Sequence, residues 1–389
     1  MIPREEAEQI LKDIPVKPTP EEVSLEECRG RVLAEDIISP LDLPPFDKAA
    51  MDGYALRSSD QAEKYRIVEV IAAGSHPQRP LQPGECAKIM TGGKLPPGAD
   101  RVVRREVTQE EDGWLVIVGE DKESNVCYQG EDIRRGEVVL EKGTFLRPQE
   151  VAVLASVGVT RVKVYCQPTV GLLATGSEIV SPGEPLREGQ IYDSNTYSLA
   201  AQVAATGARL KKVGRGRDEP ALLRRELEEL LDECDLVLVS GGVSVGDYDY
   251  VPTILQELGV QIHFHKLAIK PGKPTIFGTR GETAVFGVPG NPVSTFVIFE
   301  LLIKPFIFRL MGHSYQPLLL KGELAEELKR KKSRREAWLP VEYRQGQVRS
   351  LPYHGSAHIH ALTRANGLIA FPRGVKILPK GSQIVVRPI

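Results

Sequence analysis

The 389-residue sequence has few cysteines and no excess of either charge. Its five cysteines lie 58, 41, 39 and 68 residues apart, so they form no CxxC pair, and their number is odd. This spacing argues against a disulfide framework or a zinc site and favours a reducing compartment. Fifty basic and fifty-two acidic side chains give a net charge of −2, without the positive excess that binding to a nucleic-acid backbone needs. We therefore expect a cytoplasmic protein that does not bind nucleic acid.

Long apolar runs and two common nucleotide-binding motifs are also missing. No stretch of about 18 apolar residues occurs, and charged residues interrupt the start of the chain, so we expect neither a membrane span nor a secretory signal. The absence of GxxxxGK followed by Ser or Thr argues against a P-loop ATPase, and the absence of GxGxxG argues against a dinucleotide-dependent dehydrogenase. A chain of this length exceeds one hydrophobic core, which predicts about two to four domains.

The residue patterns that are present divide the chain into helical, β-rich and mixed regions. Apolar spacing predicts helices over residues 5–14 and 23–37, and short β-rich runs between glycine and proline turns predict a small all-β module over about 54–140. A helix is expected from about residue 147. From Thr169 strands alternate with helices, which is typical of a parallel sheet. After a basic stretch, KRKKSRR, short strands predict a last small β domain.

Three loops in the parallel α/β region combine glycines with hydroxyl groups. They are Thr175–Glu178, Gly241–Asp249 and Pro289–Ser294, and each follows a predicted strand. In a parallel sheet, ligands bind outside the carboxyl ends of the strands. Glycine lets the backbone approach a phosphate or a similar oxyanion closely. We therefore expect an anion-binding site in these loops.

Carboxylates occur in or near the same loops. They are Glu178, Asp218, Asp247 and Asp249. A few carboxylate oxygens shared with substrate phosphates are the ligands that magnesium prefers. Each residue could instead cap a helix or occupy its first turn, and Asp218, just before Glu219 and Pro220, is the clearest example of that alternative.

Basic residues surround a stiff turn between the second and third loops. In KLAIKPGKP, Lys266, Lys270 and Lys273 accompany Pro271 and Pro274. Because the prolines restrict the backbone, the lysines are presented in fixed positions. A preorganised group of ammonium ions is suited to an oxyanion.

Two earlier segments also carry candidate site residues. PPFDKAAMDGYAL contains Asp47 and Asp52, and IMTGGKLPPGAD contains Thr91. An interdomain linker and a hairpin turn explain these segments equally well from the residues alone.

Taken together, the motifs closely resemble the molybdopterin molybdenumtransferase family, the MoeA type, which includes the gephyrin E domain. The resemblance covers nearly the whole chain. The motifs that carry it are PPFDKAAMDGYAL, IMTGGKLPPGAD, GEDIRRG, LLATGSEIV, IYDSN, SGGVSVGDYDY, KLAIKPGKP, GVPGNPVS and GSAHIHALTRANGLIAFP.

The resemblance implies a multi-domain α/β plus β architecture in an elongated homodimer. The implied domains are an N-terminal helical and mixed domain (1–45 plus 137–165), a β-rich insertion (46–136), a molybdopterin-binding α/β domain with a central parallel sheet (166–314) and a C-terminal β barrel (315–389). The implied active site lies between the α/β domain of one subunit and the β insertion of the other.

The resemblance also implies the reaction. Adenylylated molybdopterin and molybdate give molybdenum cofactor and AMP, with Mg²⁺. Molybdopterin adenylyltransferase and proteins of molybdoenzyme maturation are the implied partners. The sequence leaves open whether molybdate or tungstate is preferred, and which oxygen attacks phosphorus.

Carried over residue by residue, the family's motifs imply a set of site residues. The catalytic positions are Asp52, Asp132, Glu178, Asp218 and Asp249, of which Glu178, Asp218 and Asp249 would hold the metal. The substrate-binding positions are Thr91, Ser244, Lys270, Lys273, Pro289, Pro292, Arg335 and Ser356. The adjacent Arg334 could take the place of Arg335. Ser177 replaces an acidic residue that many members carry in the first loop.

Two other functions stay open at this point. The region from about 166 to 314 also resembles the fold that adenylylates molybdopterin, so the chain could transfer the nucleotide instead of the metal. A non-catalytic, gephyrin-like scaffold is the second alternative. The flanking β domains argue against the first, and the complete set of carboxylates and lysines argues against the second.

Overall fold

The structure is a computed structural model, and it describes residues 1–216, 219–243, 250–353 and 355–389. The chain divides into two compact units. The first unit contains residues 1–22, 30–34 and 163–389, and the second contains residues 23–29 and 35–162. Each unit is described separately.

The second unit is built around a β-sheet in the order β7-β4-β6-β5-β9-β8. Its strands are β4 (Gly53–Leu56), β5 (Tyr65–Ile71), β6 (Glu85–Ile89), β7 (Arg101–Arg104), β8 (Thr108–Glu111) and β9 (Trp114–Ile117). Alternate residues of β4 enter different cores. Ala55 packs in one cluster with Ala87 and Ile89, whereas Tyr54 packs in another with Cys86. This period of two is what a strand buried on both faces requires, and it confirms the predicted β module.

The remaining elements of the second unit are short. They are η1 (Leu25–Glu27), β2 (Ile37–Ile38), β3 (Lys48–Ala49), η2 (Arg105–Val107), β10 (Val126–Cys127), β11 (Val138–Leu140) and the helix α2 (Pro148–Ser156). Strands β1 (Pro20–Ser24) and β12 (Arg161–Tyr165) lie where the division between the units passes. Helix α2 confirms the helix expected from about residue 147.

The helix predicted over residues 23–37 is wrong. The chain instead forms the end of β1 and then the single 3₁₀ turn η1, which Ser24 and Glu27 close as a capping box. Gly30 then takes a left-handed φ of 77°, which ends any helix because other residues avoid this region. The apolar residues responsible for the prediction, such as Val32 and Leu33, are buried. Their burial occurs in extended chain, where Leu33 pairs with Val164.

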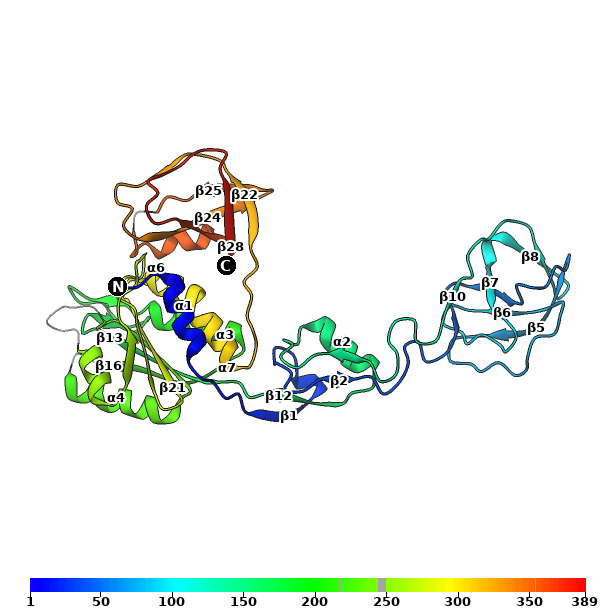
Figure 1. The fold of residues 1–389 in the computed structure, drawn as a ribbon, viewed down its shortest axis with the longest axis horizontal. Helices are drawn as coiled ribbons and strands as arrows, with labels where there is room; N and C mark the ends of the chain where they lie inside the picture. Colours follow the sequence, from blue (N-terminus) through cyan, green and yellow to red (C-terminus); the bar gives the residue numbers. More distant parts are fainter. Residues whose placement is uncertain (217–218, 244–249, 354) are drawn as a thin grey trace. The chain divides into compact units, whose positions relative to one another are not determined.

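The first unit contains the predicted parallel α/β sheet, in the order β16-β13-β17-β21-β20-β18 (Figure 1). The strands are β13 (Thr169–Thr175), β16 (Arg209–Gly216), β17 (Leu236–Ser240), β18 (Gln261–Phe264), β20 (Ile276–Arg280) and β21 (Thr283–Val288). The ladders among β16, β13, β17 and β21 are parallel, and β20 and β18 add an antiparallel edge. Two short strands, β14 (Ile179–Val180) and β15 (Ile191–Tyr192), pair with each other outside this sheet.

Helices cover both faces of this sheet. They are α3 (Asn195–Thr206), α4 (Pro220–Glu233), α5 (Val251–Glu257), α6 (Pro292–Ile298) and α7 (Lys304–Leu310). On one face Val237 and Val239 share a core with Leu227 of α4. On the other, Phe286 of β21 contacts Phe306 of α7, with ring centroids 5.8 Å apart. The apolar segment after Pro292 is not one continuous α-helix, because the π-helical turn η3 (Phe299–Ile303) lies between α6 and α7.

The C-terminal part of the first unit is a closed β barrel. Strand β24 (Glu336–Arg344) pairs with both β25 (Gln347–Ser350) and β26 (Gly367–Phe371). The ring closes through β22 (Leu320–Leu324) and β28 (Gln383–Pro388). Alternating inward residues such as Val341, Val348 and Ile369 fill its core. This barrel confirms the fold expected for the last region.

Several smaller elements complete the first unit. They are α1 (Arg4–Asp13), β19 (Ile269–Lys270), β23 (Leu328–Lys329), η4 (Ile359–Arg364) and β27 (Ile377–Leu378). Helix α1 confirms the helix predicted over residues 5–14. Strand β19 pairs in parallel with the start of β24, at Ile269 with Glu336 and Lys270 with Ala337. This pairing places the lysine-bearing turn against the barrel. Within the described residues, no helix combines the length and the apolar character needed to cross a membrane.

Candidate active site

The three glycine-containing loops leave neighbouring parallel strands. Strand β17 lies between β13 and β21, and Ser240 at its end pairs with Ala174 and Val288 at the ends of the other two. From β13 the chain passes through α3 to β16, which lies on one side of β13. From β16 it returns through α4 to β17, which lies on the other side of β13. This change of direction makes a topological switch point, where open α/β sheets bind ligands. The carboxyl edge of β13 and β17 is therefore the candidate site.

Asn195, the first residue of α3, connects the end of β17 to the third loop. Its Nδ2 donates to Ser240 Oγ and to the Gly290 carbonyl, both at 2.8 Å. The side chain is buried, with 7% exposed. Sequence reasoning missed this role, although Asn195 was part of the recognised IYDSN motif. An asparagine at the start of a helix that follows strand β13 was the available signal.

Asp193 fixes the start of the same helix. Its Oδ1 accepts a hydrogen bond from the Thr196 N–H at 3.0 Å, and the residue is buried. This bond satisfies one of the amide groups that a helix leaves free at its N-terminus. Ser194, which directly precedes the helix, makes no side-chain capping bond, so Asp193 takes this role. It thereby holds Asn195 in position between the loops.

Glycine is required where the first two loops approach each other. Gly241 has a φ of 93°, and a Cβ at this position would lie 2.4 Å from the Thr175 carbonyl oxygen. Gly176 has a φ of 145°, and a Cβ there would lie 2.7 Å from Glu178 Oε2. Gly241 therefore excludes a side chain on steric and conformational grounds, and Gly176 disfavours one through its backbone conformation. The Glu178 carboxylate consequently lies against the end of β13.

This edge presents oxygen atoms suitable for a hard cation. Thr175 Oγ1 and Asn195 Oδ1 are buried, and neither has a hydrogen-bond partner in the described parts of the chain. Together with the Glu178 carboxylate they supply the neutral and charged oxygen ligands that Mg²⁺ prefers. Asp218, Asp249 and Ser244 lie outside the described residues. Among the described residues, no group of three His, Cys, Asp or Glu side chains could hold a metal ion.

The third loop brings a barrel residue to the same region. Pro289 is buried, and its carbonyl accepts a hydrogen bond from Thr295 Oγ1 at 2.6 Å. Pro292 begins α6, where its missing N–H leaves no donor unpaired. The next amide, that of Val293, donates to the Ser356 carbonyl at 3.0 Å. Ser356 is thus brought next to the loop that contains Pro289 and Pro292.

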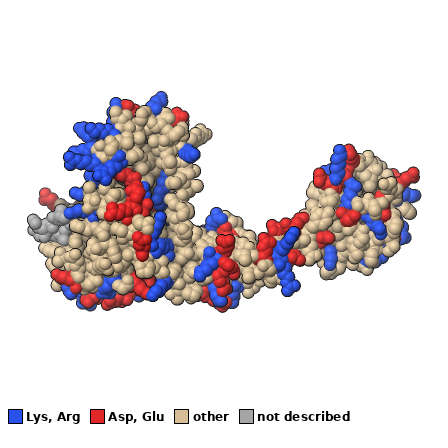
Figure 2. Space-filling model, in the orientation of Figure 1, with Lys and Arg blue, Asp and Glu red and all other residues tan. Residues whose placement is uncertain are grey.

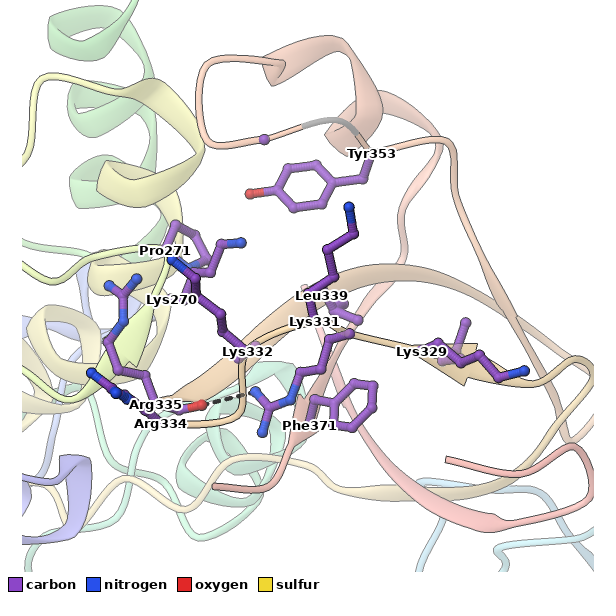
Figure 3. Close-up of a pocket in the computed structure, with 14 residues that line it drawn as sticks. Lys270, Pro271, Lys329, Lys331, Lys332, Arg334, Arg335, Leu339, Tyr353 and Phe371 are labelled. Carbon is purple, nitrogen blue, oxygen red and sulfur yellow. Dashed lines mark hydrogen bonds between the residues drawn. The ribbon is translucent and has the colours of Figure 1, made fainter. Parts of the chain in front are cut away.

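A basic pocket adjoins β19 and the barrel. It has a volume of about 740 Å³, and Lys270, Arg334 and Arg335 all line it (Figure 3). Arg335 also donates to the Ile269 carbonyl at 3.1 Å, which fixes its guanidinium beside the lysine turn. Both arginines therefore accompany Lys270. Lys273 is exposed and is not among the described residues that line the pocket.

Asp52 and Thr91 meet in the second unit. Asp52 Oδ1 accepts hydrogen bonds from the Thr91 hydroxyl and from the Thr91 N–H, both at 2.7 Å. These bonds, the hydroxyl first, lower the pKa of Asp52, and the nearby Arg105 guanidinium lowers it further. Asp52 is therefore ionised at neutral pH and orients Thr91. Asp132 lies elsewhere in the unit, where its N–H donates to the Leu43 carbonyl at 3.0 Å.

Family models match three consecutive regions of the chain. They are the MoeA N-terminal region (domain I and II) over residues 2–158, a probable molybdopterin binding domain over 171–309, and the MoeA C-terminal region (domain IV) over 321–389. The molybdopterin molybdenumtransferase of Haemophilus influenzae is 36% identical, over 98% of this chain and 96% of its own. The chain belongs to the molybdopterin molybdenumtransferase family. The family predicted from the sequence is therefore confirmed, and with it an enzyme of the transferase class.

Other relatives agree with this assignment. The molybdopterin molybdenumtransferase of Bacillus subtilis is 33% identical, over 94% of this chain and 88% of its own. The crystal structure of the molybdopterin biosynthesis moeA protein from Pyrococcus horikoshii OT3 is 32% identical and has a TM-score of 0.87, with both chains covered completely. The fold of this transferase is thus the fold of a solved MoeA protein.

Proposed function

We propose that this transferase inserts molybdenum from molybdate into adenylylated molybdopterin and releases AMP, with Mg²⁺ as cofactor. The observation that carries the proposal is the meeting of three loops at the switch point of β13 and β17, where Asn195 connects Ser240 with Gly290. Family membership supplies the reaction. The oxygen ligands at the strand ends and the basic pocket at the barrel support it.

In this proposal the strand-end loops bind the pyrophosphate end of the substrate. Gly176 and Gly241 let the chain at the ends of β13 and β17 pack closely together, so that both loops can contact the same phosphate groups. Glu178, with Asp218 and Asp249, would hold Mg²⁺, which when bound neutralises phosphate charge and polarises the phosphoanhydride. The protein's own part is to orient the substrate, because Asp193 fixes α3 and Asn195 fixes the loops that α3 adjoins.

Molybdate is assigned to the lysine turn and the adjoining arginines. Lys270 and Arg335 line one pocket, and Arg334 lines it too. Lys273, Ser244 and Ser356 complete the proposed subsite. A tetrahedral dianion suits such donors, since charge-assisted hydrogen bonds to ammonium and guanidinium groups are short and strong.

Three further parts of the proposal rest on the resemblance. The first is a homodimer whose active site uses Asp52, Thr91 and Asp132 of one subunit with the α/β loops of the other. The second is the set of four domain boundaries, 1–45 plus 137–165, 46–136, 166–314 and 315–389. The third is a cytoplasmic setting, with molybdopterin adenylyltransferase and molybdoenzyme-maturation proteins as partners.

The test is a reconstitution with purified protein, adenylylated molybdopterin, molybdate and Mg²⁺. We expect AMP and metal-containing cofactor to appear in equal amounts, with AMP measured by chromatography and metal by mass spectrometry. The control replaces Glu178 with Gln, which should slow both products together. Adenylylation of molybdopterin with ATP, without metal insertion, would instead identify an adenylyltransferase. A folded protein with neither activity would indicate a scaffold.

A further inference from the structure

Arg105 lies directly opposite Asp52 in the second unit, where β4 begins and β7 ends. The two strands are antiparallel, and Gly53 pairs with Arg104. One position further along the ladder, the Arg105 N–H donates to the Asp52 carbonyl at 3.1 Å. Residues opposite each other in such a ladder project their side chains from the same face, with Cβ atoms about 4.5–5.5 Å apart. The Asp52 carboxylate and the Arg105 guanidinium therefore leave the sheet side by side.

The chain holds Asp52 in place from both neighbouring strands. On one side, Gly53 lets β4 approach β7 closely, because a Cβ atom at this position would overlap the Val103 carbonyl oxygen. On the other side, Thr91 follows β6 and donates to Asp52 Oδ1 through its hydroxyl and its N–H. Arg105 thus fixes the backbone of Asp52, and Thr91 fixes its carboxylate.

Part of each side chain remains available to a ligand. Asp52 Oδ1 is occupied by Thr91, whereas Oδ2 has no hydrogen-bond partner in the described parts of the chain. Within residues 1–216, 219–243, 250–353 and 355–389, the Arg105 guanidinium makes no hydrogen bond or ion pair. Both residues are exposed. The pair therefore presents one free carboxylate oxygen and one free guanidinium to solvent.

The neighbouring acid on this side of the sheet does not need Arg105 as a partner. Glu110 Oε2 accepts hydrogen bonds from the Tyr54 hydroxyl and from Lys88 Nζ, both at 2.7 Å. Lys88 thus supplies the positive charge for Glu110. The Arg105 guanidinium is left to act together with Asp52.

The charges around this pair favour a ligand of mixed character over a polyanion. Figure 2 shows Lys and Arg next to Asp and Glu over the part of the chain labelled β5 to β8 in Figure 1, without a large patch of one sign on the visible face. Phosphate or molybdate oxygens are repelled by the ionised carboxylate of Asp52. Its free Oδ2 requires a hydrogen-bond donor, and the guanidinium beside it requires an acceptor.

A pterin ring has donors and an acceptor side by side on one edge. Its 2-amino group and its N3–H are neighbouring donors, and the C4 carbonyl next to them is an acceptor. A carboxylate oxygen accepts from such donors, and a guanidinium donates to such a carbonyl. Because one partner in each bond is charged, both bonds are strong.

We propose that Asp52 and Arg105 together recognise the amino and carbonyl edge of the pterin ring, which makes Arg105 a specificity-determining residue of this enzyme. The identity of the ligand rests on the proposed function, in which adenylylated molybdopterin supplies the ring. The pyrophosphate stays at the strand-end loops of the α/β sheet, and the β module takes the opposite end of the same substrate. Ring recognition and turnover are tested separately.

The first experiment compares two small ligands that differ in one group. 6-Hydroxymethylpterin carries the 2-amino donor, and 6-hydroxymethyllumazine has a carbonyl in its place. Binding to the full-length protein is measured by equilibrium dialysis in metal-free buffer. We expect the pterin to bind about 10-fold or more tightly, because a site built to bond an N–H group rejects an analogue that lacks it. Equal affinities, or no binding of the pterin, would overturn the proposal. Guanosine carries the same edge on a purine, and tighter binding of guanosine would also overturn it.

Asp52→Asn should reverse this preference. Because Thr91 donates to Oδ1, the amide oxygen of the new side chain takes that position and its NH₂ group faces the ligand. A donor at this position bonds the lumazine carbonyl and opposes the pterin amino group. A purely structural role of Asp52 predicts that both ligands weaken equally. An unchanged preference in the folded variant would therefore refute direct recognition.

The second experiment tests Arg105 with a matched control. Arg105→Met should weaken the pterin and the lumazine alike by about 10-fold, because both carry the C4 carbonyl, and Arg105→Lys should restore part of the affinity. Arg66→Met removes an arginine from β5 that is 59% exposed and whose partner Glu85 keeps Arg79. It should bind both ligands as the unmodified protein does. Equal affinity of the Arg105 and Arg66 variants would remove Arg105 from the site.

Turnover separates the role of Arg105 from the proposed function. In molybdenum insertion, Arg105→Met should raise the KM for adenylylated molybdopterin about 10-fold, with a smaller change in kcat and an unchanged dependence on molybdate. A lower kcat at unchanged KM would contradict ring recognition. If the unmodified protein inserts no molybdenum, the proposed function fails, and the preference for pterin over lumazine still decides whether Asp52 and Arg105 recognise the ring.

Discussion

Asn195→Ala tests whether the bridge between Ser240 and Gly290 holds the active site together. The substitution removes two hydrogen bonds of 2.8 Å from a side chain that is 7% exposed. Each bond contributes about 1 kcal/mol, and the buried Ser240 hydroxyl left without its partner adds a desolvation cost of similar size. We therefore expect the free energy of unfolding to fall by about 2 to 3 kcal/mol.

Asn195→Ala should lose activity even under conditions in which the variant stays folded. When the bridge is removed, the loops after β17 and β21 are no longer held in register, and small displacements of binding groups slow catalysis strongly. Molybdenum insertion should therefore fall at temperatures where the variant is fully folded. Urea denaturation measures the stability, and hydrogen exchange of peptides from the α/β sheet locates the change.

Gln202→Ala is the matched control on the same helix. Gln202 Nε2 donates to Glu300 Oε1 at 3.1 Å, away from the strand ends. Its loss should destabilise the protein by roughly 1.5 to 3 kcal/mol, because the acceptor is a carboxylate, and should leave insertion close to normal. The bridging role is refuted if Asn195→Ala has the same free energy of unfolding as the unmodified protein. It is also refuted if both variants lose activity equally.

Three further predictions follow from individual contacts. Thr91→Val removes the hydroxyl that bonds Asp52, so the pKa of Asp52 should rise toward its ordinary range in an NMR titration, and an unchanged value would contradict the contact. The Arg79 guanidinium is the main cause that lowers the pKa of Glu85 to about 2. Because the pKa of Glu85 is lower in the folded than in the unfolded protein, its ionised form stabilises the fold. This stabilisation is complete above about pH 4.5 and is lost as the pH falls toward 2. Glu85→Gln should make the denaturation midpoint depend less on pH in this range. If the midpoints of the variant and of the unmodified protein change with pH in parallel, the assignment is refuted. Mixed Asp52→Ala and Asp249→Ala proteins should regain part of the activity in the proposed homodimer, and failure despite demonstrated subunit exchange would place each site within one chain.

The sequence alone predicted the elements whose signal is local. Strands such as 169–175 and 283–288 are continuous apolar runs between turn residues, and α4 has leucines at helical spacing. Both patterns report directly on which faces are buried. The loops that follow the strands were also identified, because parallel strands must end at a common edge. The family was recognised from motifs along nearly the whole chain.

The sequence was misleading where the same apolar spacing is compatible with a helix and with extended chain. Residues 23–37 bury Val32 and Leu33 as a helix would, but do so in extended chain after Gly30. One turn of helix and two short extended segments can bury the same few side chains. The choice between them depends on partners such as Val164, which is distant in the sequence.

Only the tertiary structure decided which polar groups face one another. Asn195 bonds Ser240 and Gly290 across 45 and 95 residues, and no local pattern records that geometry. The pairing of β19 with β24 likewise brings Lys270 to a basic segment about sixty residues later. Periodicity fixes which face of an element is buried, because burial depends on the element itself. A site depends on how the elements pack, and packing is settled by the fold as a whole.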